Sequence, residues 1–174
     1  QENENNSAII AMDPLDHYSI ENAIKWVNSQ AGDIHCWLNI IGGFTMGKHV
    51  EACHDDWSYM YNTNFMTALN CCQQILPKMK QNGWGRIVNL GTRAAVNGMP
   101  LTGPYCTSKA AVHMLTKIIA LENGNGITCN ALLPGIIDTP SNRNQMPDAN
   151  HGNWVGPKQI AMRIETLLLS DENG

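Results

Sequence analysis

Tyr105 and Lys109 are the two residues whose types and spacing point most directly to chemistry. Four positions apart on a helix, they lie on one face. A phenol loses its proton only at about pH 10, but a neighbouring ammonium favours the phenolate and brings proton transfer within reach near neutral pH. The pattern alone is weak, because chance often places tyrosine and lysine at this spacing in helices that carry out no reaction.

Two further polar residues strengthen this interpretation. Thr92 follows an apolar run thirteen residues before Tyr105, and its hydroxyl could donate to a substrate oxygen as charge develops there. Threonine is also an ordinary turn residue, so a purely local role stays open. Asn64 lies in the middle of a predicted helix, where it either satisfies a buried backbone group or holds a water in a proton relay. These two roles are compatible.

The elements that must position these residues follow from apolar runs that alternate with helical patterns. Strands are predicted over residues 8–12, 36–41, 86–90 and 127–132. Helices are predicted from a cap at Ser19 to Gly32, and over residues 56–80, 103–122 and 158–169. Strands separated by helices at this spacing predict crossovers and a parallel sheet, with ligands beyond the carboxyl ends of the strands.

Composition limits the classes of function. The chain has 174 residues, of which 43% are hydrophobic and 15% charged, and we expect one folded domain over residues 1–174. A net charge of −4 without a basic run argues against nucleic acid or a membrane surface as partner, and no apolar stretch is long enough to cross a bilayer. Six cysteines without a CxxC pair indicate free thiols in a reducing cytoplasm, not disulfides or a metal site.

Several linked motifs resemble the short-chain dehydrogenase/reductase family. W-L-N-I-I-G-G-F is followed by R-I-V-N-L-G-T, by Y-C-T-S-K-A-A-V and by I-T-C-N-A-L-L-P-G-I-I-D-T-P, in the family's order and spacing. The resemblance implies an α/β fold, a Rossmann-like parallel sheet with flanking helices. It also implies NAD- or NADP-dependent hydride transfer between nicotinamide and a carbonyl, alcohol or pterin-like substrate.

The resemblance assigns roles to the four polar residues. It implies Tyr105 as general acid/base, with Lys109 as the partner that lowers its pKa and contacts the ribose. Thr92 stands where the family usually has serine, and Asn64 stands where it has the relay asparagine.

The same resemblance implies the cofactor contacts. Asp13 would lie by the adenine, with Asn39 and Gly42 under the nearer ribose and the phosphates. The residues expected around the nicotinamide are Pro134, Gly135, Ile137 and Thr139, the last facing the carboxamide. Local alternatives stay open, because Asp13 followed by proline can simply end a strand, and Pro134 followed by glycine can be an ordinary turn.

The sequence departs from the family pattern in three respects. Thr92 adds a methyl group to the usual serine, and Ile40 with Ile41 replaces an asparagine–alanine pair. The glycine-rich strand–turn–helix unit that binds the pyrophosphate does not occur in this sequence, which is expected to be truncated at both ends relative to the family. Arg93 and Arg143 are flexible cations that cannot replace several aimed amides, so weak or absent dinucleotide binding is expected.

The predicted helices 56–80 and 103–122 should pack side by side on one face of the sheet. In the resembling family these helices form the dimer interface, so a homo-oligomer is expected. The apolar residues that suggest such an interface are Met66, Leu69, Val112, Leu115 and Ile119. That these side chains face only their own sheet stays an open alternative.

Other functions remain open at this stage. A non-catalytic Rossmann-like remnant that binds a partner chain is favoured by the missing glycine-rich unit, whereas hydrolase chemistry lacks a G-x-S-x-G elbow. Residues 138–150, Trp154 and the G-T-R-A-A run resemble dihydropteridine-reductase-like members of the family. This resemblance suggests a subgroup and leaves the substrate undetermined.

Overall fold

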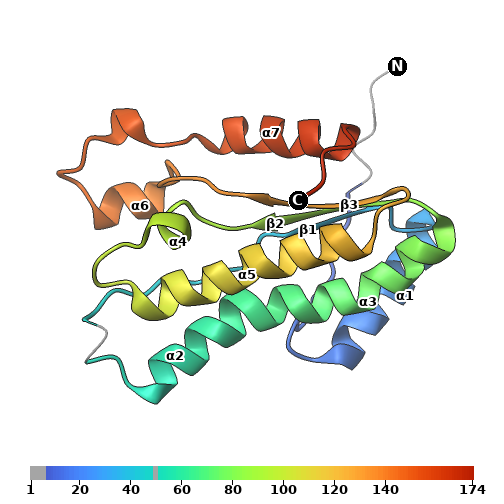
Figure 1. Cartoon of the computed structure of the whole chain (residues 1–174), viewed down its shortest axis with the longest axis horizontal. Helices are drawn as coiled ribbons and strands as arrows, with labels where there is room; N and C mark the ends of the chain where they lie inside the picture. Colours follow the sequence, from blue (N-terminus) through green and yellow to red (C-terminus); the bar gives the residue numbers. More distant parts are fainter. Residues whose placement is uncertain (1–6, 49–50) are drawn as a thin grey trace.

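The computed structural model describes residues 7–48 and 51–174. Three parallel strands form one sheet in the order β1 (Cys36–Asn39), β2 (Gly85–Leu90) and β3 (Ile127–Leu132). The strands are parallel because the chain returns through a helix after each of the first two. In Figure 1, α1 (His17–Ala31), α3 (Thr67–Asn82) and α5 (Gly103–Glu122) cover one face, and α7 (Pro157–Leu169) covers the other. The predicted Rossmann-like architecture is confirmed.

The predicted helix over 56–80 is one long helical stretch with an irregular middle. It begins as α2 (His54–Met60), widens into the π-helical turn η1 (Tyr61–Met66) and continues as α3. Short elements complete the chain: α4 (Ala94–Asn97), α6 (Pro140–Gln145) and the 3-10 turn η2 (His151–Asn153). The helix predicted over 103–122 has the bounds of α5, and Pro104 stands in its first turn, where a missing N–H leaves no hydrogen bond unmade.

The prediction of a strand over residues 8–12 is wrong. These residues form no strand, and the Ile9 side chain is fully exposed. A strand requires a neighbour for its backbone N–H and C=O groups, and within the described residues none pairs with this segment. The strand predicted over 36–41 ends at Asn39, which leaves Ile40 and Ile41 exposed beyond it.

The start of α1 also differs from the prediction. Asp16, not Ser19, is the N-cap, because its carboxylate accepts from the Tyr18 N–H at 3.0 Å. Ser19 Oγ instead accepts a hydrogen bond from the Asp13 N–H at 2.8 Å. The predicted end at Gly32 is confirmed, with a backbone N–H that bonds to Asn28 O.

The core lies between the sheet and the helices α1, α3 and α5. Its buried members are Ile20, Ile24, Cys71, Cys72, Ile75, Met79, Ile87, Ile119, Ala120, Ile127 and Cys129. All six cysteines are free, as predicted. Burial raises the pKa of the Cys71 thiol to about 11 and that of Cys72 to about 12, so these side chains act as small apolar groups.

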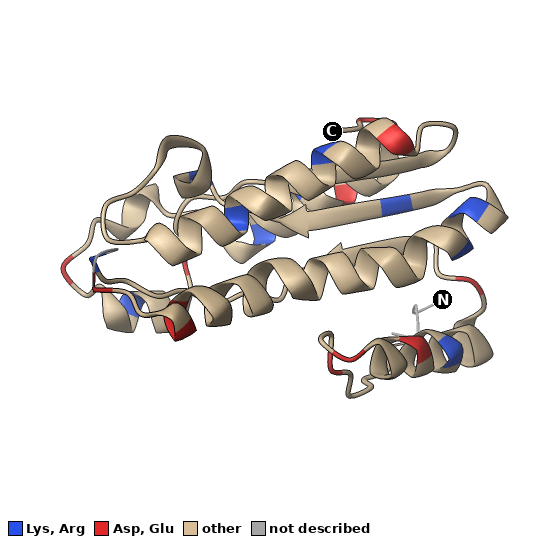
Figure 2. Ribbon diagram, turned by 60° about the horizontal axis from the view of Figure 1, so that its bottom comes forward, with Lys and Arg blue, Asp and Glu red and all other residues tan. Residues whose placement is uncertain are grey.

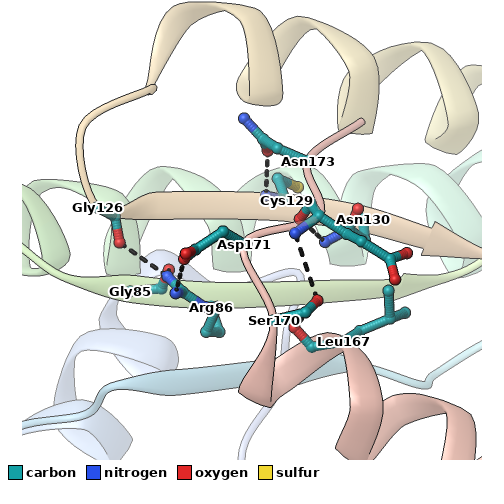
Figure 3. A network of polar contacts seen from close by, with 10 residues as sticks. Gly85, Arg86, Gly126, Cys129, Asn130, Leu167, Ser170, Asp171 and Asn173 are labelled. Carbon is teal, nitrogen blue, oxygen red and sulfur yellow. Dashed lines mark hydrogen bonds and ion pairs between the residues drawn. The ribbon is translucent and has the colours of Figure 1, made fainter.

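Residues 170–174 pass back along the sheet, and their side chains bond to β2 and β3 near the amino ends of these strands (Figure 3). The buried Arg86 side chain donates to Gly126 O at 2.9 Å and to Asp171 Oδ1 at 2.8 Å. Asn173 Oδ1 accepts from the Cys129 N–H at 2.9 Å. Because Arg86 stands near the start of β2, these contacts stabilise the edge of the sheet away from the carboxyl ends of the strands.

No helix in the described ranges has both the length and the apolar composition needed to span a bilayer.

Candidate active site

The four residues predicted to do chemistry come together at the carboxyl ends of the strands. Thr92 follows β2, and its side chain lies near enough to Tyr105 on α5 to lower the pKa of that phenol. Lys109 stands one turn beyond Tyr105, and its Nζ donates to Leu90 O at 2.7 Å. The loop after β1 closes the group, since a Cβ atom on Gly42 would lie 2.9 Å from Asn64 Oδ1 and 3.0 Å from Lys109 Nζ. The structure therefore brings these residues together at the edge of the sheet where a ligand site was predicted.

Asn64 is 1% exposed and uses both ends of its amide. Its Oδ1 accepts from the Gly43 N–H at 2.9 Å, and its Nδ2 donates to Ser108 Oγ at 2.9 Å. Ser108 Oγ in turn donates to Tyr105 O at 2.8 Å, so Asn64 links the β1 loop to the turn of α5 that carries Tyr105. The first of its two predicted roles, satisfying a buried backbone group, is confirmed. Its place in a π-helical turn fits the frequent occurrence of such turns at functional sites.

The protonation chemistry of Tyr105 differs from the prediction. Burial raises the pKa of Tyr105, and the neighbouring Thr92 side chain opposes that rise only in part. Lys109 does not contribute to this shift: its Nζ bonds to Leu90 O, and its own pKa is lowered to about 8 by burial. In this structure the expected lowering of the Tyr105 pKa by Lys109 is absent.

Two neighbours of the site were missed from the sequence. The His113 imidazole, one turn beyond Lys109 on α5, accepts from the Thr92 N–H at 3.2 Å. The spacing of four from Lys109 and eight from Tyr105 was the available signal, because such positions share a helix face. The ring of Phe44 packs edge-on against Tyr105, with 4.8 Å between centroids, and nothing in its sequence position indicated that contact.

Two predicted cofactor residues have side chains engaged elsewhere. Asn39 donates to Asn89 Oδ1 at 2.7 Å and accepts from Trp37 Nε1 at 2.8 Å, so its amide cross-links the sheet. Asp13 Oδ1 accepts from the Leu15 N–H at 2.9 Å within the turn before α1. The Asp13 side chain therefore stabilises a turn, and the local alternative that it ends a strand is wrong, because no strand precedes it.

The segment after β3 approaches the site at its beginning. The Arg93 N–H donates to Pro134 O at 3.2 Å, and a Cβ on Gly135 would lie 3.1 Å from the Arg93 guanidinium. Further along, Ile137 forms a parallel bridge with Val155, and the Thr139 hydroxyl caps α6 by accepting from the Asn142 N–H at 3.2 Å.

The two arginines considered for phosphate contact differ in their surroundings. Arg143 forms a two-pronged ion pair with Asp138 at 2.5 and 2.8 Å, which holds the pKa of that carboxyl below its usual range. Arg93 is exposed beside Gly135. Over the described residues, no three His, Cys, Asp or Glu side chains meet in a way that could hold a metal ion.

The site thus consists of a tyrosine, a lysine and a hydroxyl at the carboxyl edge of a parallel sheet. The chain belongs to the short-chain dehydrogenase family, whose profile, described as short chain dehydrogenase, matches residues 1–150.

Curated relatives agree with this assignment. The chain is 33% identical over 155 residues to the 3beta-hydroxysteroid dehydrogenase of Mediterraneibacter gnavus, covering 81% of this chain and 56% of that protein. It is 39% identical over 129 residues to nodulation protein G of Azospirillum brasilense, covering 73% of this chain and 52% of that protein. The chain spans about half the length of the curated relatives it matches.

Solved structures share the fold. ElxO with NADP bound superposes with a TM-score of 0.87 at 24% identity, covering 95% of this chain and 72% of that one. A gluconate 5-dehydrogenase from Burkholderia cenocepacia, in complex with NADP and tartrate, superposes with a TM-score of 0.81 at 24% identity, covering 90% of this chain and 66% of that one.

Proposed function

We propose that this chain carries the reacting half of a nicotinamide-dependent oxidoreductase, which transfers hydride between NAD or NADP and a carbonyl, alcohol or pterin-like substrate. One observation carries the proposal: the half-buried Tyr105 phenol, with the Thr92 side chain beside it, stands one turn from the buried Lys109 ammonium. Such a group can move a proton to or from a substrate oxygen in a partly dry site.

The residues present fit the nicotinamide-ribose half of such a cofactor. Lys109 Nζ has three N–H donors and uses one on Leu90 O, while the missing Cβ of Gly42 lets the β1 loop approach this ammonium closely. The described residues offer fewer groups that could bind the pyrophosphate half of the cofactor. Gly42 and Gly43 follow β1, but within the described residues they lead into an extended segment, so no helix amino end stands behind them.

The mechanism assigns one task to each side chain. Tyr105 Oη donates a proton to the substrate oxygen during reduction and accepts it during oxidation. The Thr92 hydroxyl donates a hydrogen bond to the same oxygen as negative charge develops there. The Lys109 ammonium, held by Leu90 O, would bind the ribose of the cofactor, and Asn64 fixes the β1 loop against α5. The bound nicotinamide supplies or accepts the hydride.

The names of two relatives narrow the class of substrate that we propose. The 3beta-hydroxysteroid dehydrogenase of Mediterraneibacter gnavus and the D-beta-hydroxybutyrate dehydrogenase of Rhizobium meliloti are named for secondary alcohols. We therefore favour a ketone/secondary-alcohol pair, with the pterin-like C=N bond as the alternative. The free thiols support a location in the reducing cytoplasm.

Titration with NADH and NADPH tests this proposal against the non-catalytic binding module. The five tryptophans report binding by fluorescence, and the absorbance of the reduced nicotinamide reports turnover of a carbonyl panel. We expect millimolar dissociation constants, because losing two or three charge-assisted bonds to the pyrophosphate costs roughly 3–9 kcal/mol. Neither binding nor turnover at several millimolar would favour the binding module. A dissociation constant in the low-micromolar range would contradict the expected weak binding of the dinucleotide.

A further inference from the structure

His113 binds the backbone of a residue that belongs to the reacting group. It lies one turn beyond Lys109 on α5, half-buried, and its Nε2 is 3.2 Å from the Thr92 nitrogen. Thr92 is also the residue whose side chain lies beside Tyr105 and lowers its pKa. The backbone of Thr92 therefore has an anchor on α5, while its Oγ1 accepts from the Ala94 N–H at 3.3 Å.

We propose that His113 is a positioning residue of the site. Its neutral imidazole holds the Thr92 backbone and thereby sets the direction of the Thr92 hydroxyl toward Tyr105. The contact itself rests on geometry alone, whereas its kinetic consequence rests on the function proposed above.

The residue before Thr92 makes this close approach possible. A Cβ atom on Gly91 would overlap His113 Nε2 and the Leu133 side chain, so a side chain at this position would displace the imidazole. Gly91 is itself fixed, because its N–H donates to Leu132 O at 2.8 Å. Gly91 and His113 therefore act as a pair, although 22 residues separate them.

The contact requires one protonation state of the ring. Nε2 can accept from the Thr92 N–H only when the ring is neutral and its proton is on Nδ1, a tautomer that we assign from the donor. Burial lowers the pKa of His113, and the Lys109 charge lowers it further.

The other groups around the ring do not favour its protonation. Tyr105, on the same face of α5, is neutral because its pKa is raised. The residues of α4 and the end of β3 near the ring carry no charged side chain. A neutral ring therefore persists until the pH falls below its ordinary value of about 6.5.

Protonation of His113 would place an N–H against the Thr92 N–H, and the two donors would separate. Thr92 would then lose its backbone anchor, and its hydroxyl would lose its fixed direction. Turnover is therefore expected to fall on the acid side as His113 gains a proton, although Tyr105 and Lys109 keep their protonation states in that range.

Nuclear magnetic resonance tests the contact without any need for activity. In the full chain labelled with nitrogen-15, we expect an unprotonated Nε2 at neutral pH. We also expect a Thr92 amide resonance that shifts with the titration of His113, at a midpoint below about 6.5. Gly91→Ala and His113→Leu should abolish that shift, whereas His17→Gln, which removes an exposed histidine on α1, should leave it intact. A protonated Nε2 at neutral pH, or a Thr92 amide that ignores the titration, would overturn the proposal.

Kinetics test the positioning role. Misplacing the Thr92 hydroxyl should lower kcat of His113→Leu by about 10- to 100-fold, while KM for the dinucleotide stays within about twofold. His113→Gln keeps an acceptor that does not titrate, so it should restore most of kcat and remove the acid-side fall. Normal kcat in the leucine variant, or an unchanged acid limb in the glutamine variant, would refute positioning. If the wild type itself shows no turnover, the proposed function fails, and the resonance experiment still decides the His113 contact.

Discussion

Asn64 holds both backbone groups of Gly43: its Oδ1 accepts from the Gly43 N–H at 2.9 Å, and its Nδ2 donates to Gly43 O at 3.2 Å. The pairing resembles a short stretch of strand pairing made by a side chain. It fixes the loop after β1 beside Lys109, because the neighbouring Gly42 stands against Lys109 Nζ. The geometry of the site therefore depends on a residue that does not itself move a proton.

The first prediction concerns the loss of this pairing. Asn64→Ala leaves the Gly43 N–H and C=O without their partner and opens space in a buried position, so the free energy of unfolding should fall by about 2–4 kcal/mol. Urea denaturation followed by circular dichroism measures the change. Asn62→Ala, at an exposed position in the same π-helical turn, is the matched control and should change stability by less than about 0.5 kcal/mol. Equal losses in both variants would contradict the pairing.

The elements that carry the site were predictable from local signals. The helix predicted over 103–122 has the observed bounds because Pro104 marks its first turn and Gly124 follows its end. Residues close to each end therefore indicate where the helix begins and ends. Tyr105 and Lys109 share a helix face by spacing alone, and Thr92 follows a strand that its apolar run already indicated.

Other features required the folded chain. The segment 8–12 has the composition of a strand, but a strand also needs a neighbour, and composition does not provide one. Alternation along a strand does not say which polar group Asn39 meets, and the answer is Asn89 on the adjacent strand. The pKa of Tyr105 depends on burial, and the His113 contact joins segments that are distant in sequence, so neither leaves a local pattern.

Lys109 gives the second prediction, on pH dependence. Its folded pKa is lowered to about 8 from 10.5, so between these values the unfolded chain binds more protons than the folded one, and stability rises with pH. Relative to Lys109→Met, the wild type should therefore gain on the order of 2 kcal/mol between pH 8 and pH 10. Denaturant unfolding at several pH values measures this. Lys117→Met removes an exposed lysine from the same helix. The difference in stability between the wild type and this variant should not change in that way with pH. A parallel dependence in both variants would contradict the burial of the ammonium.

The third prediction is a homo-oligomer through α3 and α5. Val112 and Ile119 are buried inside the chain and so cannot form an interface, but Met114, Ile118 and Leu121 form an exposed apolar stripe on α5. No Lys, Arg, Asp or Glu occurs from residue 57 to residue 77, and Figure 2 shows the long helical stretch in tan over this length. The predicted oligomer would cover this face, which is consistent with its lack of charge.

Light scattering at micromolar concentration tests the oligomer. We expect a dimer or tetramer for the wild type and a smaller species for Ile118→Glu, because a carboxylate would be buried in the interface. The neighbouring Lys117→Glu is the control for charge alone. A monomeric wild type would contradict the predicted homo-oligomer.

The turnover of Tyr105→Phe tests the central claim most directly. The substitution removes the proton-transferring hydroxyl and keeps the ring that packs on Phe44, so the fold should be unchanged. With millimolar NADPH or NADH and the best carbonyl of the panel, we predict that kcat falls by roughly 10²-fold or more, while Tyr18→Phe, at an exposed position on α1, stays at the wild-type rate. Near-normal kcat in Tyr105→Phe, with circular dichroism unchanged, would contradict the assignment of Tyr105 as the general acid/base.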